Sequence, residues 1–374
     1  MTTTMSNLLK DMVEEILSRV PSKYTKQMRL TCKNWNALFE NKSFRKMHIE
    51  KEEAAARKLG LTRMVMMMNH NVYLMGITVN ENPSIHCLGK LGSKKVKINQ
   101  VYHCEGLLLC ILKDDDTTKV LVCNPYLRQT RWIQTRKFHH AGEYFYIYAI
   151  GYNDNSPKIL RFIIRQEQNL TLRYEIYDFD TDLWTIFEVT PNWRIVCHGG
   201  FSLKGNTYWC AVEVQNALSV VNHIICFDFT RERFGQLIPL PFKALGLQFA
   251  SFSSIRGENM AALFQSMESL KVEIWVTTKI DGENASWSNL FTLNNMPYLD
   301  KKLICTTFLL DEEKKVAVCF DDERIGTHNV INIIGEAGFL RKLELGEPAC
   351  VGWPRLCPYV PSIVQIKKRN RVKG

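Results

Sequence analysis

Residues 8–48 read LLKDMVEEILSRVPSKYTKQMRLTCKNWNALFENKSFRKMH, and their apolar spacing predicts a set of short helices. Apolar residues recur every three or four positions from Met12 to Val20, which is typical of a helix with one apolar face. Pro21 should end this helix, because it has no N–H to donate and disfavours helical geometry in the residue before it. We expect a second helix and a third short turn to follow. Their apolar residues are Met28, Cys32, Trp35, Leu38 and Phe39 in the helix, and Phe44, Met47 and Ile49 in the turn.

Three short helices within about forty residues cannot bury all of their own apolar surface. The apolar stripe must therefore dock on another part of the chain or on a partner. An ordinary helical cap packed on the main domain is one alternative, and periodicity alone leaves it open.

The order of residues in this segment resembles the F-box. The resemblance rests on Leu8, Asp11, the run EEILSRVP at 14–21, the run RLTCKNW at 29–35, and Phe44. It implies a helical bundle that docks on the Skp-type adaptor of an SCF ubiquitin ligase. The residues expected to face partly one another and partly the adaptor are Leu8, Val13, Ile16, Leu17, Val20, Pro21, Leu30, Cys32 and Trp35.

Three positions depart from the family pattern. Leu9 stands where proline is usual, Ser22 stands where plant members usually have leucine, and Thr25 replaces another usually apolar residue. A missing proline removes a preset helix start. We therefore expect a thinner docking face than the family usually presents.

Composition and charge place the chain among globular proteins. It has 374 residues, 46% of them hydrophobic, which suits one large domain and a small one. No apolar run is long enough for a membrane span, and the N-terminus has no signal-peptide layout, so we expect a cytoplasmic or nuclear protein without a membrane partner. Of the net charge of +10, five charges lie in the tail at 367–374, which leaves +5 elsewhere. A nucleic-acid partner is not expected, and the tail is interpreted as solvated or as a nuclear signal.

Twelve cysteines are scattered along the chain without a C-x-x-C pair. Buried free thiols are the expected state in a reducing compartment. A zinc site formed by Cys104, Cys110, Cys350 and Cys357 is a weaker alternative, because the spacing is irregular.

A group of strand-like runs recurs about every fifty residues from Val101 onward. A period near fifty with several strands per copy is typical of a β-propeller with kelch-like blades, in which a large aromatic residue wedges between sheets. A sixth blade would combine the early hairpin at 63–79 with a C-terminal strand at 359–366. An irregular β-sandwich is the second choice. The residues that close the five copies, 52, 50, 53 and 56 positions apart, are Trp132, Trp184, Phe234, Trp287 and Leu343.

The same region resembles the plant F-box-associated interaction domain, which implies a substrate-recruiting role. We therefore expect an α+β multidomain chain, with an α-helical F-box bundle at 1–49, a helical linker at 50–62, an all-β, kelch-like propeller at 63–366 and a basic tail at 367–374. The runs that carry the resemblance are CEGLLLC at 104–110, CNPYLRQTRWI at 123–133, YEIYDFDTDLW at 174–184, LKGNTYW at 203–209, ICFDFTRERFG at 225–235 and YVPSIVQI at 359–366.

No signature of catalysis is present in the sequence, which lacks a G-x-S-x-G elbow, a Walker loop and a G-x-G-x-x-G run. The acidic clusters at 114–116 and 321–323 are interpreted as solvated turns. We expect no enzyme activity, cofactor or metal. Arg, Tyr and Trp are typical of binding hot spots, so segments 126–132, 191–194 and 281–287 are candidates for contacts with a partner.

These observations predict a substrate-recruiting subunit of an SCF-type cullin ubiquitin ligase, with an unidentified protein as its target. Two alternatives stay open at this point. One is a degenerate F-box protein that acts as a plain interaction module. The other is a propeller enzyme or carbohydrate binder with a helical cap.

Overall fold

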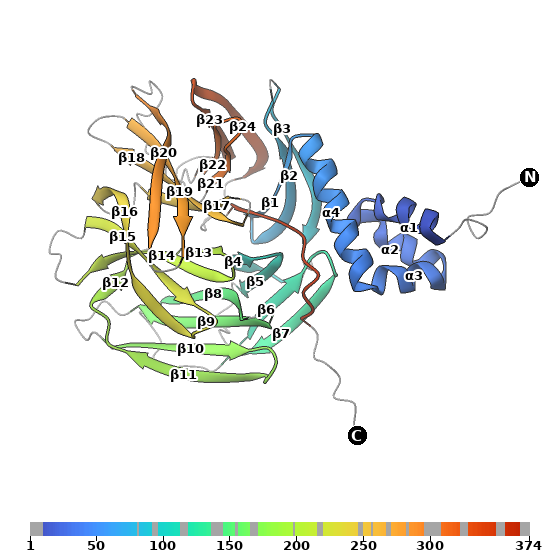
Figure 1. Ribbon diagram of the computed structural model, residues 1–374, viewed down its shortest axis with the longest axis horizontal. Coiled ribbons are helices and arrows are strands. Elements are labelled where there is room, and N and C mark those ends of the chain that lie inside the picture. Colours follow the sequence, from blue (N-terminus) through green and yellow to red (C-terminus); the bar gives the residue numbers. More distant parts are fainter. Residues whose placement is uncertain are drawn as a thin grey trace, which may run out of the picture.

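The computed structural model describes a helical module followed by a ring of β-sheets (Figure 1). The described residues are 10–80, 82–91, 96–112, 119–135, 145–153, 156–164, 171–196, 199–214, 220–245, 250–255, 257–266, 271–281, 284–294, 308–321, 328–348 and 356–366.

The helical module has one more break than the sequence pattern predicts. Cys32 has an extended backbone, with φ −155° and ψ 159°, and it separates two short helices where we expected one. Its Sγ accepts a hydrogen bond from the Trp35 N–H at 3.5 Å and so caps the next helix. The module's elements are α1 (Lys10–Ser18), a 3₁₀ turn η2 (Ser22–Tyr24), α2 (Thr25–Thr31), α3 (Lys33–Glu40) and α4 (Lys42–Lys58).

Helix α4 replaces both the expected third turn and the expected separate linker. Asn41 caps its start, because the side-chain Oδ1 accepts the Phe44 N–H at 3.1 Å. The helix then runs on without interruption across position 49 and ends before Gly60, whose φ of +64° suits glycine. The helical bundle is therefore joined to the first strand by one continuous helix and the turn at Gly60.

The described residues of the β region form six antiparallel sheets, which are the blades of a propeller. This confirms the predicted all-β propeller and overturns the β-sandwich alternative. Blade A contains β25 (Leu356–Pro358), β1 (Leu61–Met68), β2 (Asn71–Thr78) and β3 (Ser84–Leu91). Blade B contains β4 (Ile98–Cys104), β5 (Leu107–Leu112), β6 (Lys119–Asn124) and β7 (Gln129–Gln134). Blade C contains β8 (Phe145–Asn153), β9 (Ser156–Ile164), β10 (Leu172–Asp178) and β11 (Leu183–Val189).

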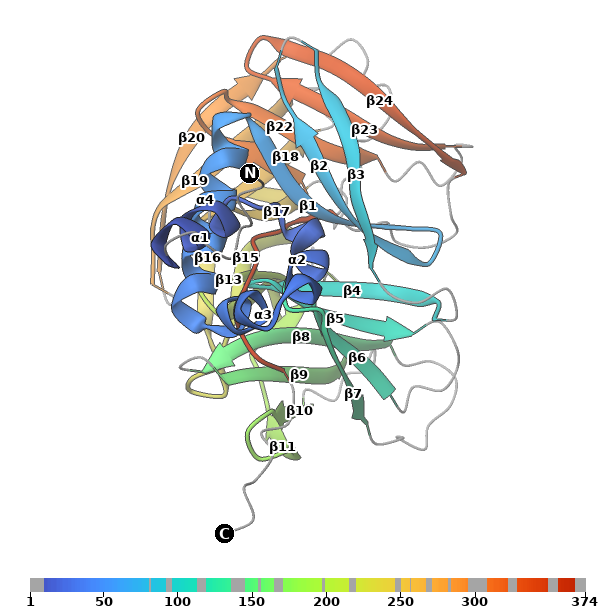
Figure 2. The same cartoon turned by 90° about the vertical axis from the view of Figure 1, so that its right-hand side faces the viewer.

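The second half of the ring contains two more four-stranded blades and the five-stranded blade D, in which β13 is an additional short strand beside β14 (Figure 2). Blade D contains β12 (Trp193–Ile195), β13 (Phe201–Leu203), β14 (Asn206–Glu213), β15 (Val220–Asp228) and β16 (Arg233–Leu245). Blade E contains β17 (Ala250–Ile255), β18 (Asn259–Ser266), β19 (Lys271–Ile280) and β20 (Ala285–Leu293). Blade F contains β21 (Phe308–Asp311), β22 (Val316–Asp321), β23 (His328–Gly335) and β24 (Gly338–Pro348).

The ring is closed by strands from both ends of the β region, as predicted, but the closing strand lies earlier than expected. Strand β25 pairs with β1, so that Leu356 lies opposite Met66 and Pro358 lies opposite Met64. Residues 359–366 form no strand and instead run on from β25 as an extended segment, which we call the C-terminal strap. The ring closure removes exposed sheet edges.

The core of the propeller is divided among the contacts between neighbouring blades. Four of the predicted closing residues act as wedges there. Trp184 Nε1 donates to the Gln134 carbonyl of blade B, and Trp287 Nε1 donates to the Pro239 carbonyl of blade D. Phe234 packs against aromatic residues of blade C, and Leu343 packs against a cluster shared by blades F and A.

Trp132 does not have the predicted wedge role, because 49% of it is exposed. Strand alternation explains this difference. Its neighbour Arg131 points inward instead, and its guanidinium donates to the Tyr177 hydroxyl and to Asp182 of blade C, both at 2.8 Å.

Candidate functional site

The helical module has a small apolar core of its own. Leu17, Phe39 and Phe44 are buried in it, and Phe39 meets Phe44 edge to face at 5.2 Å between ring centroids. Val13, Val20 and Trp35 pack against this core and are only partly buried. Leu17 is 1% exposed, so it belongs to the core of the module and offers no surface to a partner.

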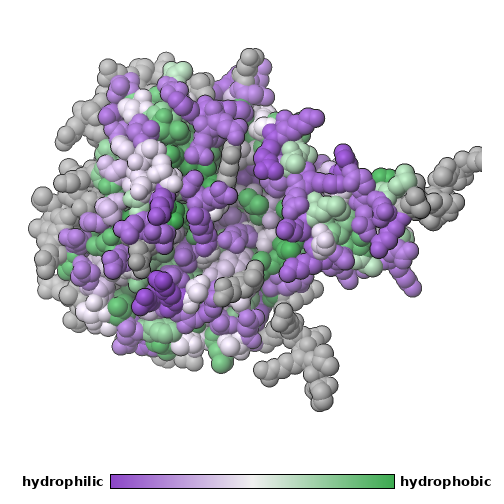
Figure 3. All heavy atoms as spheres, in the orientation of Figure 1, coloured by the Kyte–Doolittle hydropathy of each residue, from purple (hydrophilic) through white to green (hydrophobic). Residues whose placement is uncertain are grey.

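The other predicted adaptor residues lie on the surface of the module. Leu30 is 78% exposed and Ile16 is 40% exposed, while Pro21 and Cys32 are also classed as exposed. Leu8 lies outside the described residues. Figure 3 shows apolar residues among hydrophilic ones on the visible face of the module. Single exposed leucines are common on protein surfaces, and it is the presence of several exposed apolar residues on one small module that favours contact with a partner.

Two further apolar residues on this surface were missed by the residue-by-residue prediction. Met12 and Tyr24 are both about half exposed. The signal for Met12 was present, because it lies four positions before Ile16 on the apolar stripe of the first helix. Tyr24 carries no such signal, since it lies in the 3₁₀ turn between two helices.

The polar departures at Ser22 and Thr25 have local structural partners. The Thr25 hydroxyl donates to the Ser22 carbonyl at 2.8 Å and stabilises the 3₁₀ turn. The Ser22 N–H donates to Glu52 Oε1 of α4 at 3.1 Å. Leu9 lies outside the described residues. These two departures therefore serve the fold of the module, and its exposed apolar residues lie elsewhere.

Helix α4 holds the module to the propeller through charged side chains. Arg63 at the start of β1 pairs with Glu53 and with Glu52, the latter at 3.3 Å. Burial raises the pKa of Glu53, and the nearby Arg63 charge opposes this shift. Lys51 pairs with Glu15 of α1, and its hydrogen bond lowers the pKa of that carboxyl, with Arg19 acting in the same direction.

The turn between β6 and β7 forms a second connection. The Tyr126 hydroxyl lies 3.0 Å from His48 Nδ1, and His48 Nε2 lies 2.6 Å from the Val20 carbonyl oxygen. Arg128 Nη2 donates to the Lys23 carbonyl at 3.3 Å. Segment 126–132 was expected to be a free binding surface, but its first residues are occupied by the helical module.

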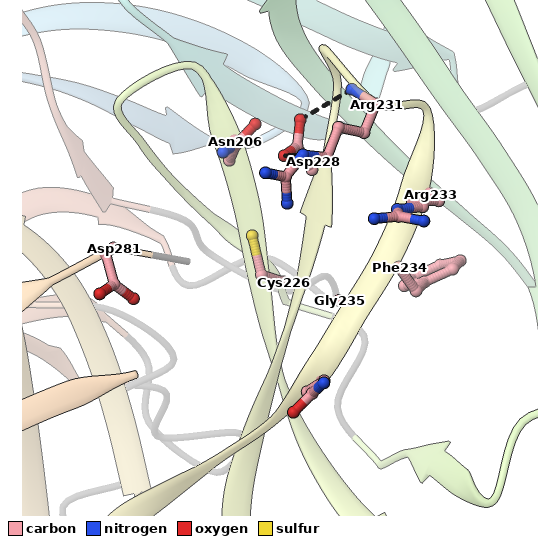
Figure 4. A pocket seen from close by; sticks show the side chains of 9 residues that line it. Asn206, Cys226, Asp228, Arg231, Arg233, Phe234, Gly235 and Asp281 are labelled. Carbon is pink, nitrogen blue, oxygen red and sulfur yellow. Dashed lines mark hydrogen bonds and ion pairs between the residues drawn. The ribbon is translucent and has the colours of Figure 1, made fainter. Parts of the chain in front are cut away.

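The two other candidate segments differ from each other. Trp193 of segment 191–194 is buried and packs on Phe234, with 4.8 Å between ring centroids, so it is a core residue. Asp281 of segment 281–287 lies at the edge of a recess of about 280 Å³ between blades D and E (Figure 4). Figure 4 also shows the ion pair of Arg231 with Asp228 in this recess. The lining residues are Asn206, Cys226, Asp228, Arg231, Arg233, Phe234, Gly235, Gln236 and Asp281.

The alternative zinc site is not formed. Cys104 lies in the cluster between blades B and C, whereas Cys110 lies in the cluster between blades A and B. Cys350 lies outside the described residues, and the described part of the chain contains no group of three His, Cys, Asp or Glu residues arranged to hold a metal ion. Burial raises the pKa of the Cys104 thiol well above its usual range.

No helix in the described ranges is long and apolar enough to cross a membrane.

The fold and the surface together define a class of protein: a β-propeller that carries a small helical module with exposed apolar residues. Residues 63–366 match the F-box associated beta propeller domain, and residues 5–47 match the F-box domain. The chain therefore belongs to the family of F-box proteins with an F-box associated β-propeller.

Three relatives from Arabidopsis thaliana are similar over almost the whole chain. An F-box protein is 58% identical and is matched over 100% of this chain and 95% of its own length. An F-box/kelch-repeat protein is 45% identical over 97% of this chain and 90% of its own length. A protein with the name Peroxiredoxin-2A is 57% identical over 99% of this chain and 70% of its own length. Proteins of the F-box and propeller family are typically non-catalytic adaptors.

Proposed function

We propose that this chain is the substrate-recruiting subunit of an SCF-type cullin ubiquitin ligase. The F-box would dock on a Skp-type adaptor, and the propeller would hold a target protein. The observation that supports this most directly is that the helical module completes its own core and still leaves Leu30 and Ile16 exposed. Unpartnered apolar side chains on a folded module gain free energy when a partner covers them, by about 25 cal/mol per Å² of apolar area.

The chain would act in this ligase by proximity. A ubiquitin-charged enzyme on the cullin scaffold would carry the thioester, and a lysine amine of the bound target would attack it. The resulting amide bond releases the enzyme's thiol. Holding the target near the thioester raises the effective concentration of lysine there. In this role the chain contributes no catalytic group of its own.

The recess between blades D and E is the best candidate for a contact with the target. It offers cationic, anionic and amide side chains on one wall and Asp281 on the other. This mixture suits a polar segment of a protein better than an apolar ligand. It opens among the turns that join the third and fourth strands of blades D and E, and these turns lie at the same end of the blades as the turn carrying Tyr126.

We place the protein in the cytoplasm, the nucleus or both. A cullin ligase acts in these compartments, and free thiols such as Cys104, Cys110 and Cys226 are stable in a reducing environment. Microscopy of the fluorescently tagged full chain tests this assignment, and retention in a secretory compartment would contradict it.

Adaptor binding is tested best at Leu30, because a charge there leaves the core of the module intact. The Leu30→Asp variant should lose affinity for a Skp-type adaptor by at least about tenfold, since it removes apolar contact worth ~1.5–3 kcal/mol and buries a charge. The measurement is co-purification with the adaptor, followed by titration of the pure proteins. Leu183→Asp is the matched control, because Leu183 is a 64% exposed leucine on the outer strand of blade C.

The Leu17→Asp variant separates docking from folding. Because Leu17 is buried in the core of the module, this change should unfold the F-box, which circular dichroism would detect as lost helical signal. If the parent chain does not bind any Skp-type adaptor while its F-box is folded, the ligase role is wrong and the chain is a plain interaction module.

A further inference from the structure

Blades B, C and D share the same six-residue turn between their third and fourth strands. Each turn begins with Asn or Asp, whose Oδ1 accepts backbone N–H groups two or three residues later. The fifth residue of each turn has a positive φ, at Arg128, Asp182 and Glu232. The turns span residues 124–129, 178–183 and 228–233.

The third residue differs among these three equivalent turns. It is Asp180 in blade C and Thr230 in blade D, and both are exposed to solvent. In blade B it is Tyr126, which is partly buried because it contacts the helical module. The same backbone therefore carries a polar residue at two places and a tyrosine at the one place where the F-box docks.

Tyr126 reaches the centre of the F-box through one histidine. Its ring packs on His48 with 5.8 Å between centroids, and its hydroxyl contacts His48 Nδ1 at 3.0 Å and donates to the Arg45 carbonyl at 3.4 Å. His48 is fully buried and also packs against Phe39 and Phe44 in the core of the module. Its other ring nitrogen contacts the Val20 carbonyl beyond the end of α1. Tyr126 thus contacts α4 directly, and through His48 it is connected to Phe39 of α3 and to the segment that follows α1.

The turn that carries Tyr126 is itself held in place by the C-terminal strap. Asn124 Nδ2 donates to the carbonyls of Ser362 and Val364, both at 2.9 Å. Gln129 accepts the Ile366 N–H at 3.0 Å. Tyr126 therefore projects from a fixed platform, and its side chain has little freedom to follow a moving F-box.

We propose that Tyr126 is a positioning residue that sets the orientation of the F-box relative to the propeller. At the junction with β1, the module is held by the chain itself and by the ion pairs of Arg63 with Glu52 and Glu53, and attachment at this one end permits the helices to swing. The turn between β6 and β7 adds a second point of attachment, in which the exposed Arg128 hydrogen bond to Lys23 is peripheral and the more deeply buried Tyr126–His48 contact removes this freedom. If the chain acts as the proposed ligase subunit, the same contact also fixes the distance from the bound target to the ubiquitin thioester. Only this second effect rests on the proposed function. The orientation of the F-box does not depend on it.

The test exchanges the residues of the two equivalent turns. Tyr126→Thr places the blade D residue in blade B, and Thr230→Tyr is the matched control in blade D. Spin labels are introduced as non-natural amino acids at Lys26 of α2 and Lys204 of the propeller, because twelve cysteines preclude thiol labelling. Pulsed electron spin resonance then gives the distribution of distances between the labels in the full chain.

We expect a single narrow peak in the distribution of label-to-label distances for the parent and for Thr230→Tyr. For Tyr126→Thr we expect this peak to be replaced by a broad distribution. Thermal melting and adaptor capture should be unchanged in all three. Tyr126→Phe, which keeps the ring and lacks the hydroxyl, should broaden the distribution less. The proposal is overturned if both Tyr126 variants keep the parent distribution, or if Thr230→Tyr broadens it equally.

The orientation can be judged separately from the ligase role. A parent chain that shows a narrow distance but does not capture an adaptor contradicts the proposed function and leaves the positioning role intact. In a reconstituted ligase, Tyr126→Thr should bind the adaptor as the parent does but modify a wider set of lysines. An unchanged set of lysines, beside a broadened distance, contradicts the consequence for ubiquitin transfer.

Discussion

Leu17 and Leu30 are the same residue type in the same small module, and they have opposite surroundings. Leu17 fills the core with Phe39 and Phe44, whereas Leu30 is almost fully solvated. A charge at the first position should unfold the module, and a charge at the second should only weaken binding. The two variants described above therefore separate stability from partner binding at the scale of single residues.

His103 gives a second residue-scale prediction, which concerns acid sensitivity. Burial lowers the pKa of His103 to about 4 from an ordinary value of 6.5, and its Nε2 accepts the Gly106 N–H at 3.0 Å, which requires a neutral ring nitrogen. A histidine with a depressed pKa contributes stability that is complete above pH 6.5 and is lost as the pH falls from 6.5 towards 4. The loss should be at most about 3 kcal/mol.

The measurement is the free energy of unfolding in urea across this pH range. His103→Gln should flatten the dependence, because glutamine can accept the same N–H and does not titrate. His86→Gln is the control, since His86 is exposed on blade A. An equal slope in the parent and in His103→Gln would rule out this histidine as the source of acid sensitivity.

At the scale of elements, the C-terminal strap depends on a close approach to the turn between β4 and β5. Gly106 has φ +82°, and a Cβ there would lie 2.4 Å from Ser362 Cβ and 2.7 Å from the Val360 carbonyl oxygen. Neither neighbour is the flexible end of a long side chain. Glycine is therefore required both for its backbone conformation and for the space that it leaves.

Gly106→Ala should destabilise the chain by about 2–4 kcal/mol, because it combines a strained positive φ with a clash against the strap. Gly89→Ala in β3 is the matched control: a Cβ there meets nothing within 4 Å, so we expect a change within about 1 kcal/mol. Urea unfolding of both variants checks this. If the two variants have equal free energies of unfolding, the strap moves away from position 106 without destabilising the chain.

At the scale of the whole molecule, the ring depends on a short C-terminal segment. β25 has three residues, yet its Leu356 is fully buried, and Ile366 at the end of the strap is fully buried between blades B and C. The interactions of this segment with β1 and β6 span more than two hundred residues of sequence. They can form only after nearly the entire chain is present.

Deletion of residues 356–374 should therefore abolish cooperative melting, because it removes the three buried side chains of Leu356, Tyr359 and Ile366, worth ~2–5 kcal/mol each, and opens a sheet edge. Deletion of residues 367–374 alone should leave the melting temperature unchanged. Calorimetry of the two truncated chains provides the comparison. If the chain with the longer deletion still melts in one cooperative transition, with the same unfolding enthalpy as the parent, the ring closes without β25.

The sequence by itself determined the kind of elements and their order, because these depend on local chemistry. Helical spacing, alternating strands and turn residues act over a few positions, and a fifty-residue repeat then leaves few ways to arrange the strands. The hairpin of β1 and β2 and the F-box resemblance were predicted in this way. The extended backbone at Cys32 was not, since its apolar spacing suits one continuous helix.

Only the tertiary structure decided which apolar residues stay outside and what Tyr126 contacts. Leu17 and Leu30 were both expected to contact the adaptor, Leu17 from the apolar stripe of its helix and Leu30 from the F-box resemblance, and their different burial follows from which side of each helix meets Phe39 and Phe44. Tyr126 and His48 are 78 positions apart and meet only after blade B and the F-box are both folded. Burial and docking are properties of surfaces assembled from distant segments, so no local pattern in the chain specifies them.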